Sequence, residues 1–391
     1  MKLGSRRMIL PFMGTAVVCL LRVAPASGQA APEQKPLMVE DVFKNVQVLK
    51  GIPVNQFMQT MGFFSASLGL NCTYCHVTES LANWEKFAED VPLKRTARRM
   101  ILMVNAINKE NFQGRRVVTC YSCHHGGQRP KVIPSLAEQY STPEEDPNEV
   151  EITGKAPAGP SADQILDKYI QALGGAQRLA GLTSFVAKGT YEGFETFHMK
   201  VPLEVFAKAP AQRTTIVHTL QGNSTTTYDG RVGWVAAIDK PVPVLSLAAG
   251  DDLDGAKLDA DLSFPARVNQ ALTQWRVGFP AAFIGERETQ IVQGTSTGGS
   301  RVKLYFDKES GLLLRTVRYT ATPVGIVPTQ TDYSDYREVA GVKMPFHTVV
   351  TWTDGQATTE LSEVQPNVPI DAAKFAKPSA PVAPPRKPAT Q

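Results

Sequence analysis

The stretch Cys72-Thr73-Tyr74-Cys75-His76 has a second copy of its pattern in Cys120-Tyr121-Ser122-Cys123-His124. In both, two cysteines flank a pair of residues and a histidine follows directly. This spacing is typical of covalent haem attachment, because the two thiols add to the two vinyl groups of the porphyrin and the histidine ligates the iron. The sequence therefore predicts two covalently bound haem c groups. The predicted attachment and ligand residues are Cys72, Cys75 and His76 for the first haem and Cys120, Cys123 and His124 for the second.

The cysteine count supports this interpretation. The chain contains five cysteines, and the two motifs use four of them. The fifth, Cys19, lies in an apolar N-terminal run, so none is left to form a separate disulfide. A four-cysteine zinc site is one alternative, but it does not require a histidine after each pair. A redox-active disulfide within each pair is another, but neither pair is surrounded by a thioredoxin-like strand and helix pattern.

A pair of methionines precedes each motif on a segment with helical periodicity. Met58 and Met61 lie before the first motif, and Met100 and Met103 lie in the segment 94–108 before the second. A thioether on the sixth position of each iron would raise the reduction potential and exclude oxygen and peroxide, which favours electron transfer over catalysis. We expect one iron ligand from each pair. The alternative is that these methionines are ordinary core residues.

The segment 94–108 is predicted to be an amphipathic helix. Its apolar stripe is expected to consist of Met100, Met103, Val104 and Ile107. Its other side carries Lys94, Arg95, Arg98 and Arg99. Two interpretations of this basic side stay open: the arginines pair with the anionic haem propionates, or they form a solvated helix face.

The composition is that of a soluble globular protein long enough for two or three domains, with 391 residues, 42% hydrophobic and 20% charged. The formal net charge is +4, and several of the basic residues are close to the N-terminus. The rest of the chain is therefore nearly neutral. This balance predicts no nucleic-acid partner.

Residues 1–30 have the pattern of a signal peptide. Lys2, Arg6 and Arg7 form a basic start, an apolar run follows over residues 8–21, and small residues end the segment. The alternative is a retained membrane anchor, for which the apolar run is short. We therefore expect a protein exported to the periplasm, free or associated with the membrane.

The rest of the chain predicts a multidomain α + β protein. The segment 161–376 alternates apolar and polar residues in many short runs, which favours strands of one antiparallel curved sheet, half-barrel-like, with one or two helices. The helices are expected at about 162–179, interrupted by two glycines, and at about 264–275. The predicted divisions are a helical dihaem cytochrome c domain (38–134), a proline-rich linker (135–160), the β-rich domain (161–376) and a disordered tail (377–391).

Residues 39–134 resemble the cytochrome c subunit of photosynthetic reaction centres. The resemblance rests on the segment 48–54, on Ala97-Arg98-Arg99-Met100 and on the segment 118–124, in addition to the first haem motif. It implies that Met61 ligates the first haem iron and Met100 the second, with Met58 and Met103 next in order. The family has four haems, whereas this chain has two motifs. One haem of the family takes a histidine from the segment before the second motif, and residues 101–119 contain none.

The β-rich domain is similar to periplasmic lipoprotein-carrier and lipoprotein-sorting proteins of the half-barrel type. The similarity is carried by Tyr305-Phe306-Asp307, by Tyr333-Ser334-Asp335-Tyr336 and by the segment 341–345. It implies consecutive strands of a curved sheet that could hold an acyl chain, and hence a lipid ligand. A purely structural or partner-docking sheet is the alternative.

Together these observations predict a periplasmic dihaem cytochrome that transfers electrons and is not an enzyme. Its expected partners are redox proteins, including a membrane electron-transfer or reaction-centre complex, in photosynthesis or respiration. One alternative is a dihaem peroxidase-like enzyme in which one iron keeps an open position. Another is a lipid-binding β-rich domain with the haems in support.

Overall fold

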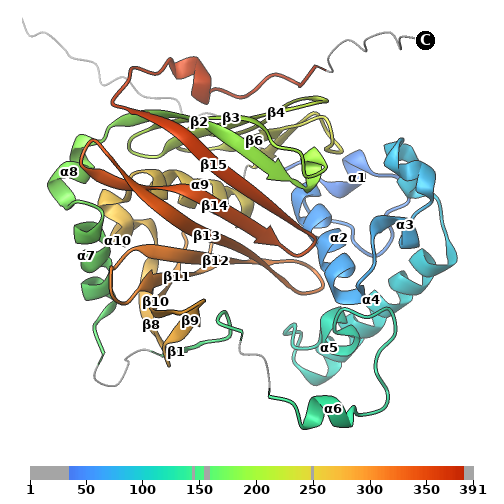
Figure 1. Cartoon of the computed structure of the whole chain (residues 1–391). Coiled ribbons are helices and arrows are strands. Elements are labelled where there is room, and N and C mark those ends of the chain that lie inside the picture. Colours follow the sequence, from blue (N-terminus) through green and yellow to red (C-terminus); the bar gives the residue numbers. More distant parts are fainter. Residues whose placement is uncertain (1–34, 143–145, 154–158, 248–250, 383–391) are drawn as a thin grey trace, which may run out of the picture. The chain divides into compact units, whose positions relative to one another are not determined.

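The computed structural model describes residues 35–142, 146–153, 159–247 and 251–382 (Figure 1). They belong to one compact unit, 34–391. The signal peptide predicted for residues 1–30 and the end of the predicted tail, 383–391, lie outside the described residues. Among the described residues, no helix has the length and apolar character needed to cross a bilayer.

The N-terminal part of the described chain is helical. α2 follows Pro53 and ends at Gly69, which adopts the left-handed conformation (φ 61°) that stops a helix. α4 has Pro92 in its first turn, where the missing backbone donor costs no hydrogen bond. The elements are α1 (Val39–Val42), α2 (Val54–Leu68), α3 (Cys72–Cys75), the 3-10 helices η1 (Thr78–Leu81) and η2 (Trp84–Ala88), α4 (Pro92–Asn111), α5 (Cys120–His124) and α6 (Leu136–Gln139).

The remaining part is built on one 15-stranded sheet, in which neighbouring strands pair antiparallel. All strands except β9 follow the order β1-β8-β10-β11-β12-β13-β14-β15-β2-β3-β4-β5-β6-β7, and β9 pairs with β10. The strands are β1 (Glu151–Thr153), β2 (Ser184–Gly193), β3 (Val201–Lys208), β4 (Gln212–Thr219), β5 (Gly222–Tyr228), β6 (Gly233–Ala236), β7 (Val244–Leu247), β8 (Thr273–Phe279), β9 (Ala282–Ile284), β10 (Arg287–Thr295), β11 (Arg301–Asp307), β12 (Leu313–Ala321), β13 (Ile326–Val339), β14 (Val342–Trp352) and β15 (Gly355–Pro366).

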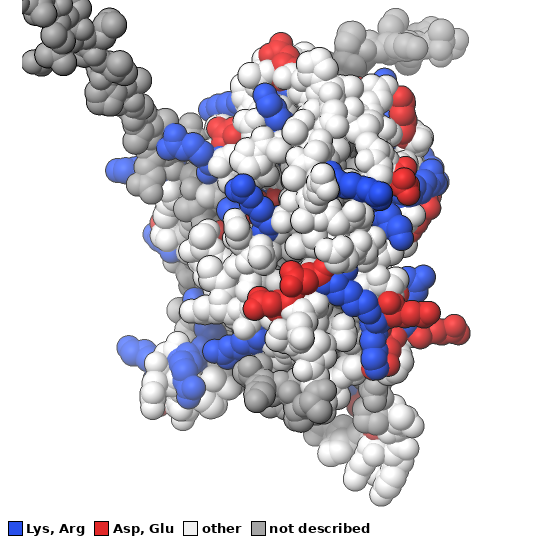
Figure 2. Space-filling view, turned by 90° about the vertical axis from the view of Figure 1, so that its left-hand side faces the viewer, with Lys and Arg blue, Asp and Glu red and all other residues white. Residues whose placement is uncertain are grey.

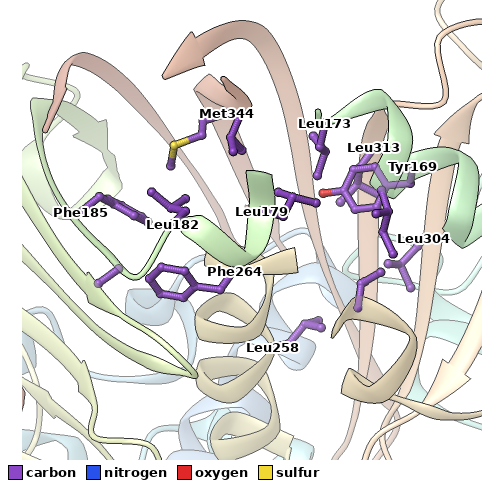
Figure 3. Close-up of a cluster of buried hydrophobic side chains, with 14 of the residues drawn as sticks. Tyr169, Leu173, Leu179, Leu182, Phe185, Leu258, Phe264, Leu304, Leu313 and Met344 are labelled. Carbon is purple, nitrogen blue, oxygen red and sulfur yellow. The ribbon is translucent and has the colours of Figure 1, made fainter. Parts of the chain in front are cut away.

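Helices pack on one face of this sheet and complete the main hydrophobic core. They are α7 (Ala162–Ala172), α8 (Ala176–Gly181), α9 (Asp251–Ser263), η4 (Pro265–Arg267) and α10 (Val268–Ala271), and a further 3-10 helix, η5 (Ala372–Phe375), follows the last strand. Leu179 of α8 and Leu258 of α9 are buried in one cluster with Leu304 and Leu313 of the sheet (Figure 3). Burial of many apolar side chains of this kind is the main stabilising term of the fold.

The surface of this part is mixed in charge. On the face that Figure 2 shows, basic and acidic side chains are interspersed among uncharged residues. This face does not present a continuous basic surface of the kind that binds nucleic acid.

One further short helix, η3 (Phe194–Thr196), follows β2.

The predicted fold class is confirmed: a helical region precedes an open antiparallel sheet that carries helices. The interruption predicted between 162 and 179 is also found, because Gly174 and Gly175 take positive φ between α7 and α8. Two expectations about the helices need correction. The sheet carries four α-helices among the described residues instead of one or two, and the helix expected at 264–275 ends at Ala271, because β8 begins at Thr273. The segment predicted to be a linker contains α6 and β1.

α2 contacts the turn that joins β12 and β13. The Phe63 ring lies against Gly325 so closely that a Cβ at this glycine would overlap it. Gln56 donates a hydrogen bond to the Ala321 carbonyl at 2.9 Å, and Arg116 donates one to the Thr322 carbonyl. The helical part and the sheet therefore share an apolar cluster as well as hydrogen bonds.

Candidate haem sites

The first motif begins on a short capped helix, α3. The Asn71 side chain accepts a hydrogen bond from the backbone of Thr73 at 3.2 Å and from its hydroxyl at 2.8 Å, which fixes the start of the helix. Cys72 is exposed and Cys75 is half-buried, and both thiols are free. Burial raises the pKa of both thiols, so at neutral pH they stay protonated.

His76 follows α3 directly and lies in a partly enclosed site. Its backbone N–H donates to the Cys72 carbonyl at 3.0 Å, which fixes the position of the backbone that carries the ring. The ring Nδ1 is buried without a hydrogen-bond partner among the described residues. The Phe87 ring meets the imidazole edge-on, with 4.8 Å between centroids. Burial, followed by the charge of Lys94, lowers the pKa of His76 to about 4, so the ring is neutral at pH 7, the form that binds iron.

A basic network lies behind this histidine. We use this term for Lys94 and Arg98 of α4 together with Asp90 and Asn45. Lys94 Nζ donates to the Phe87 carbonyl at 2.7 Å, and Arg98 Nη1 donates to Asp90 Oδ1 at 2.8 Å. Asn45 Nδ2 donates to the same Asp90 oxygen at 2.9 Å. Through Lys94, the network therefore holds Phe87, which contacts His76, next to the N-terminal half of α4.

The second motif also lies on a short capped helix, α5. The Ser122 backbone donates to the Thr119 hydroxyl at 3.4 Å, and the Thr119 backbone donates to the Ser122 hydroxyl at 3.1 Å. This reciprocal pair is a capping box. Cys120 is half-buried and Cys123 is exposed. Burial raises the pKa of the Cys120 thiol.

His124 has one ring nitrogen fixed by the backbone. Nδ1 lies 3.0 Å from the Gly127 carbonyl, and because a carbonyl only accepts, Nδ1 is the donor. This tautomer leaves Nε2 with a lone pair for a metal. The backbone N–H of Gly126 donates to the Ser67 carbonyl at 3.0 Å, which ties the end of α5 to α2.

The methionines of α4 are not core residues. Met100 and Met103 are 43% and 48% exposed. The helix buries Ile101, Val104 and Asn108 instead. The predicted apolar stripe is therefore wrong by about one residue in phase. Burial in the core therefore does not explain why two methionines precede this haem motif. Both side chains are exposed and accessible to a ligand.

The methionines of α2 have a different environment. Met58 and Met61 are half-buried. Met61 packs against a cluster that includes Phe63, Ile101 and Cys120 of the second motif. The structure therefore brings Met61 close to the second motif, while α3 of the first motif contacts α4, the helix of Met100. Which methionine serves which iron stays a prediction.

The basic side of α4 divides into two kinds of residue. The side chains of Lys94 and Arg98 are only 14% and 13% exposed, because both pair with Asp90. They are neither a solvated face nor free for a propionate. Arg95 and Arg99 are exposed. Phe87 and Asp90 were not found by sequence reasoning, although an acid four residues before Lys94 is a known helix-pair signal.

The donor set fits a haem at each motif. Each offers two free thiols on one helical turn and a following histidine; His76 is neutral at pH 7, and the Nε2 of His124 keeps its lone pair. Among the residues described, no three His, Cys, Asp or Glu side chains converge in a metal-holding group. The two cysteine pairs therefore form two separate sites.

Residues 17–158 match the sequence model of the family described as photosynthetic reaction centre cytochrome C subunit. This match confirms the resemblance predicted for residues 39–134. The reaction center cytochrome c subunit of Thermochromatium tepidum is 35% identical over 111 residues, which are 27% of this chain and 25% of that protein. Cytochrome c-554 of Chloroflexus aurantiacus is 37% identical over 107 residues, which are 25% of this chain and 23% of that protein. This chain thus spans about a quarter of the length of these relatives.

Two solved structures resemble the sheet-forming part. A LolA superfamily protein from Nitrosomonas europaea has 12% identity and a TM-score of 0.38, and the likeness covers 56% of this chain and 99% of that one. An outer membrane lipoprotein-sorting protein domain from Vibrio parahaemolyticus has 11% identity and a TM-score of 0.38, with 55% and 97% covered.

Proposed function

We propose that this chain is a c-type cytochrome with two covalent haems that transfers electrons outside the cytoplasm and is not an enzyme. The observation that carries the proposal is the repeated site: two capped helical turns, each with two free thiols and a following histidine. The match of residues 17–158 to a cytochrome c family supports the same conclusion.

In this proposal the haems supply the redox chemistry, because each iron takes up and releases one electron. The chain attaches them through Cys72, Cys75, Cys120 and Cys123. His76 and His124 provide one axial ligand each, and Met61 and Met100 provide the other. Two protein ligands on each iron would close it to small molecules, so the chain's own residues favour electron transfer over substrate chemistry.

We infer that the partners are other redox proteins in the periplasm. The N-terminal relatives are named as reaction-centre subunits, which points to a membrane electron-transfer complex as the partner class. The signal peptide predicted for residues 1–30 would deliver the chain to the periplasm, where it would meet such complexes and where haem is attached.

The lipid ligand predicted for the β-rich domain has less support. The space between its helices and its sheet is filled by the buried side chains of the main core, some of which Figure 3 shows. One pocket of about 520 Å³ on the sheet is lined by Asp335, Arg337, His347 and Glu360 beside Phe346 and Leu361, and these charges do not suit an acyl chain. A second pocket of the same volume has a more apolar lining, which includes Ile284, Leu312 and Leu314. Extraction of the purified protein with organic solvent, followed by mass spectrometry, tests this: a bound lipid would support the ligand, and its absence would count against it.

The main proposal is tested on protein that is expressed with a haem-attachment system. We expect two haems per chain and the weak near-infrared band of methionine-ligated ferric haem. Met61→Ala and Met100→Ala should each remove about half of this band, since one of two equal ligands is lost. Met58→Ala and Met103→Ala are the matched controls and should leave it unchanged. A high-spin iron in the unsubstituted protein that binds cyanide or peroxide would instead support the peroxidase-like enzyme.

A further inference from the structure

The basic network gives the first haem motif a charge environment that the second motif lacks. Lys94 Nζ donates to the carbonyls of Phe87 and Glu89, at 2.7 and 3.1 Å. Phe87 in turn places its ring against His76, with 4.8 Å between centroids. Phe87 therefore contacts both the Lys94 cation and His76, the predicted iron ligand.

A second cation strengthens this environment. Arg98 donates to Asp90 at 2.8 Å and, through Nη2, to the Asn45 carbonyl at 3.0 Å. Lys94 lies 3.7 Å from the same Asp90 carboxylate. Two cations thus share one anion, and the network carries a net charge of about +1. Because the Lys94 and Arg98 side chains are only 14% and 13% exposed, water and salt screen this charge poorly.

The surroundings of the second motif are different. His124 is held by a backbone carbonyl, that of Gly127. Cys120 packs with apolar residues, among them Phe63 and Val324. The neighbouring cationic side chain, Arg116, donates to the Thr322 carbonyl on the turn between β12 and β13. No buried pair of cations like that of Lys94 and Arg98 contacts this motif among the described residues.

We propose that the basic network of Lys94, Arg98 and Asp90 raises the reduction potential of the first haem and so makes the two haems unequal. This proposal rests on the dihaem function proposed above. The sign follows from charge: the ferric haem carries one more positive charge than the ferrous haem, so a nearby cation disfavours the oxidised form. Lys94 and Arg98 act through this field and through the packing of Phe87, so they are positioning residues.

The experiment is potentiometric titration of the holoprotein, followed at the optical band of reduced haem. Variants with a single motif, Cys120→Ala/Cys123→Ala and Cys72→Ala/Cys75→Ala, assign each one-electron wave to its haem. Lys94→Met should lower the potential of the first haem by about tenfold in its redox equilibrium, which is about 59 mV for one electron. Asp90→Asn removes the anion and should raise the same potential.

The opposite signs separate the charge effect from a packing effect. Disturbed packing around His76 would move the potential in the same direction in Lys94→Met and Asp90→Asn, and that outcome overturns the proposal. So does a wave that does not move, or an equal shift of both waves. Arg98→Gln repeats the test at a second position if Lys94→Met does not fold. Lys308→Met is the matched control, because Lys308 also pairs with a carboxylate, at 2.7 Å, but is 54% exposed; neither wave should move.

Haem content and the optical spectrum are measured on each sample before the titration. Fewer than two haems, or one high-spin iron, would contradict the proposed dihaem function itself. Two low-spin haems whose waves ignore Lys94 would leave that function intact and remove only the inference about the basic network.

Discussion

The two haem motifs have the same five-residue pattern and different surroundings. The first is enclosed by an aromatic ring and a charged network, with Phe87 against His76 and Lys94 close behind. The second is held by a backbone carbonyl on His124 and by an apolar cluster around Cys120. In the proposed dihaem protein, the motif would determine how each haem is attached, and the residues outside it would determine the electrostatic and packing environment of the iron.

The difference also concerns which other part of the chain each motif contacts. Val324, in the turn before β13, and Val327, at the start of β13, belong to the same cluster as Cys120. The sheet thus contributes apolar side chains next to the second motif. The first motif is covered by η2 and α4 of the helical region, and Asp354, in the turn between β14 and β15, contributes a negative charge that raises the pKa of Cys72 after burial has done so.

The largest expected effect is the loss of one haem at a time. Each motif has its own helix cap, Asn71 for the first and the capping box of Thr119 for the second, so attachment at one site should not require the other. Cys72→Ala/Cys75→Ala should leave one haem per chain, and Cys120→Ala/Cys123→Ala should do the same. Haem absorbance in pyridine, divided by protein mass, measures this. Loss of both haems in either variant would mean that the two sites form together.

The next effect tests the apolar cluster at the second motif. Phe63 is 7% exposed and packs against Gly325, so Phe63→Ala should leave a cavity where the helical part meets the sheet. We expect the free energy of unfolding to fall by about 3–5 kcal/mol. Denaturant unfolding measures it. Phe194→Ala is the control, since that ring is 68% exposed, and should change the free energy by less than about 0.5 kcal/mol. Equal effects would contradict the proposed importance of this cluster.

Sequence reasoning works best where a prediction depends on contiguous residues. The family resemblance of residues 39–134 rests on such residues, and the match to the family model confirms it, whereas the roles of the motif cysteines and histidines stay a prediction. Sequence reasoning failed on the phase of α4, because Asn108 is polar but buried, and its amide satisfies backbone groups. Hydropathy alone cannot identify a polar residue that is buried for its hydrogen bonds.

Some elements of the sheet-forming part lack the patterns from which sequence reasoning recognises strands and helices. β5 contains three consecutive threonines, Thr225 to Thr227, and β15 is polar on both faces over much of its length, so neither alternates apolar with polar residues. α9 was missed because its buried positions include Asp254, Gly255 and Ser263 beside Leu258, which do not form an apolar stripe. The basic network was missed because Asn45 and Asp90 are distant in sequence from each other and meet only in the fold.

A smaller effect is expected from the hydrogen bonds that lead into the second motif. Asn108 donates to the Val118 carbonyl at 2.7 Å and accepts from the backbone of Val117 and Val118 at 3.0 and 2.9 Å. Asn108→Ala should leave these buried groups unpaired and cost about 1–3 kcal/mol in the free energy of unfolding. The exposed Asn111 of the same helix, changed to Ala, is the control. The comparison of the motifs is sharpened if Asn108→Ala also lowers attachment of the second haem and not of the first.

The smallest effect is a pH dependence that should belong to the first haem alone. Burial, followed by the charge of Arg98, lowers the pKa of Lys94 from its ordinary value of 10.5, although Asp90 opposes the shift. As pH rises through this lowered pKa, Lys94 loses its positive charge while Arg98 keeps its own. The ferric form of the first haem then becomes less disfavoured, so its reduction potential should fall with increasing pH below 10.5, before that of the second haem changes.

Potentiometric titration at a series of alkaline pH values measures this shift in the single-motif variant Cys120→Ala/Cys123→Ala. Lys94→Met should remove the dependence, since the titrating group is gone, and Lys308→Met should keep it. A pH dependence of equal size in the variant that retains only the second haem would show that a general alkaline change, and not Lys94, is responsible. The contrast between the two motifs would then lie in their packing, because the charge of the network would no longer distinguish them.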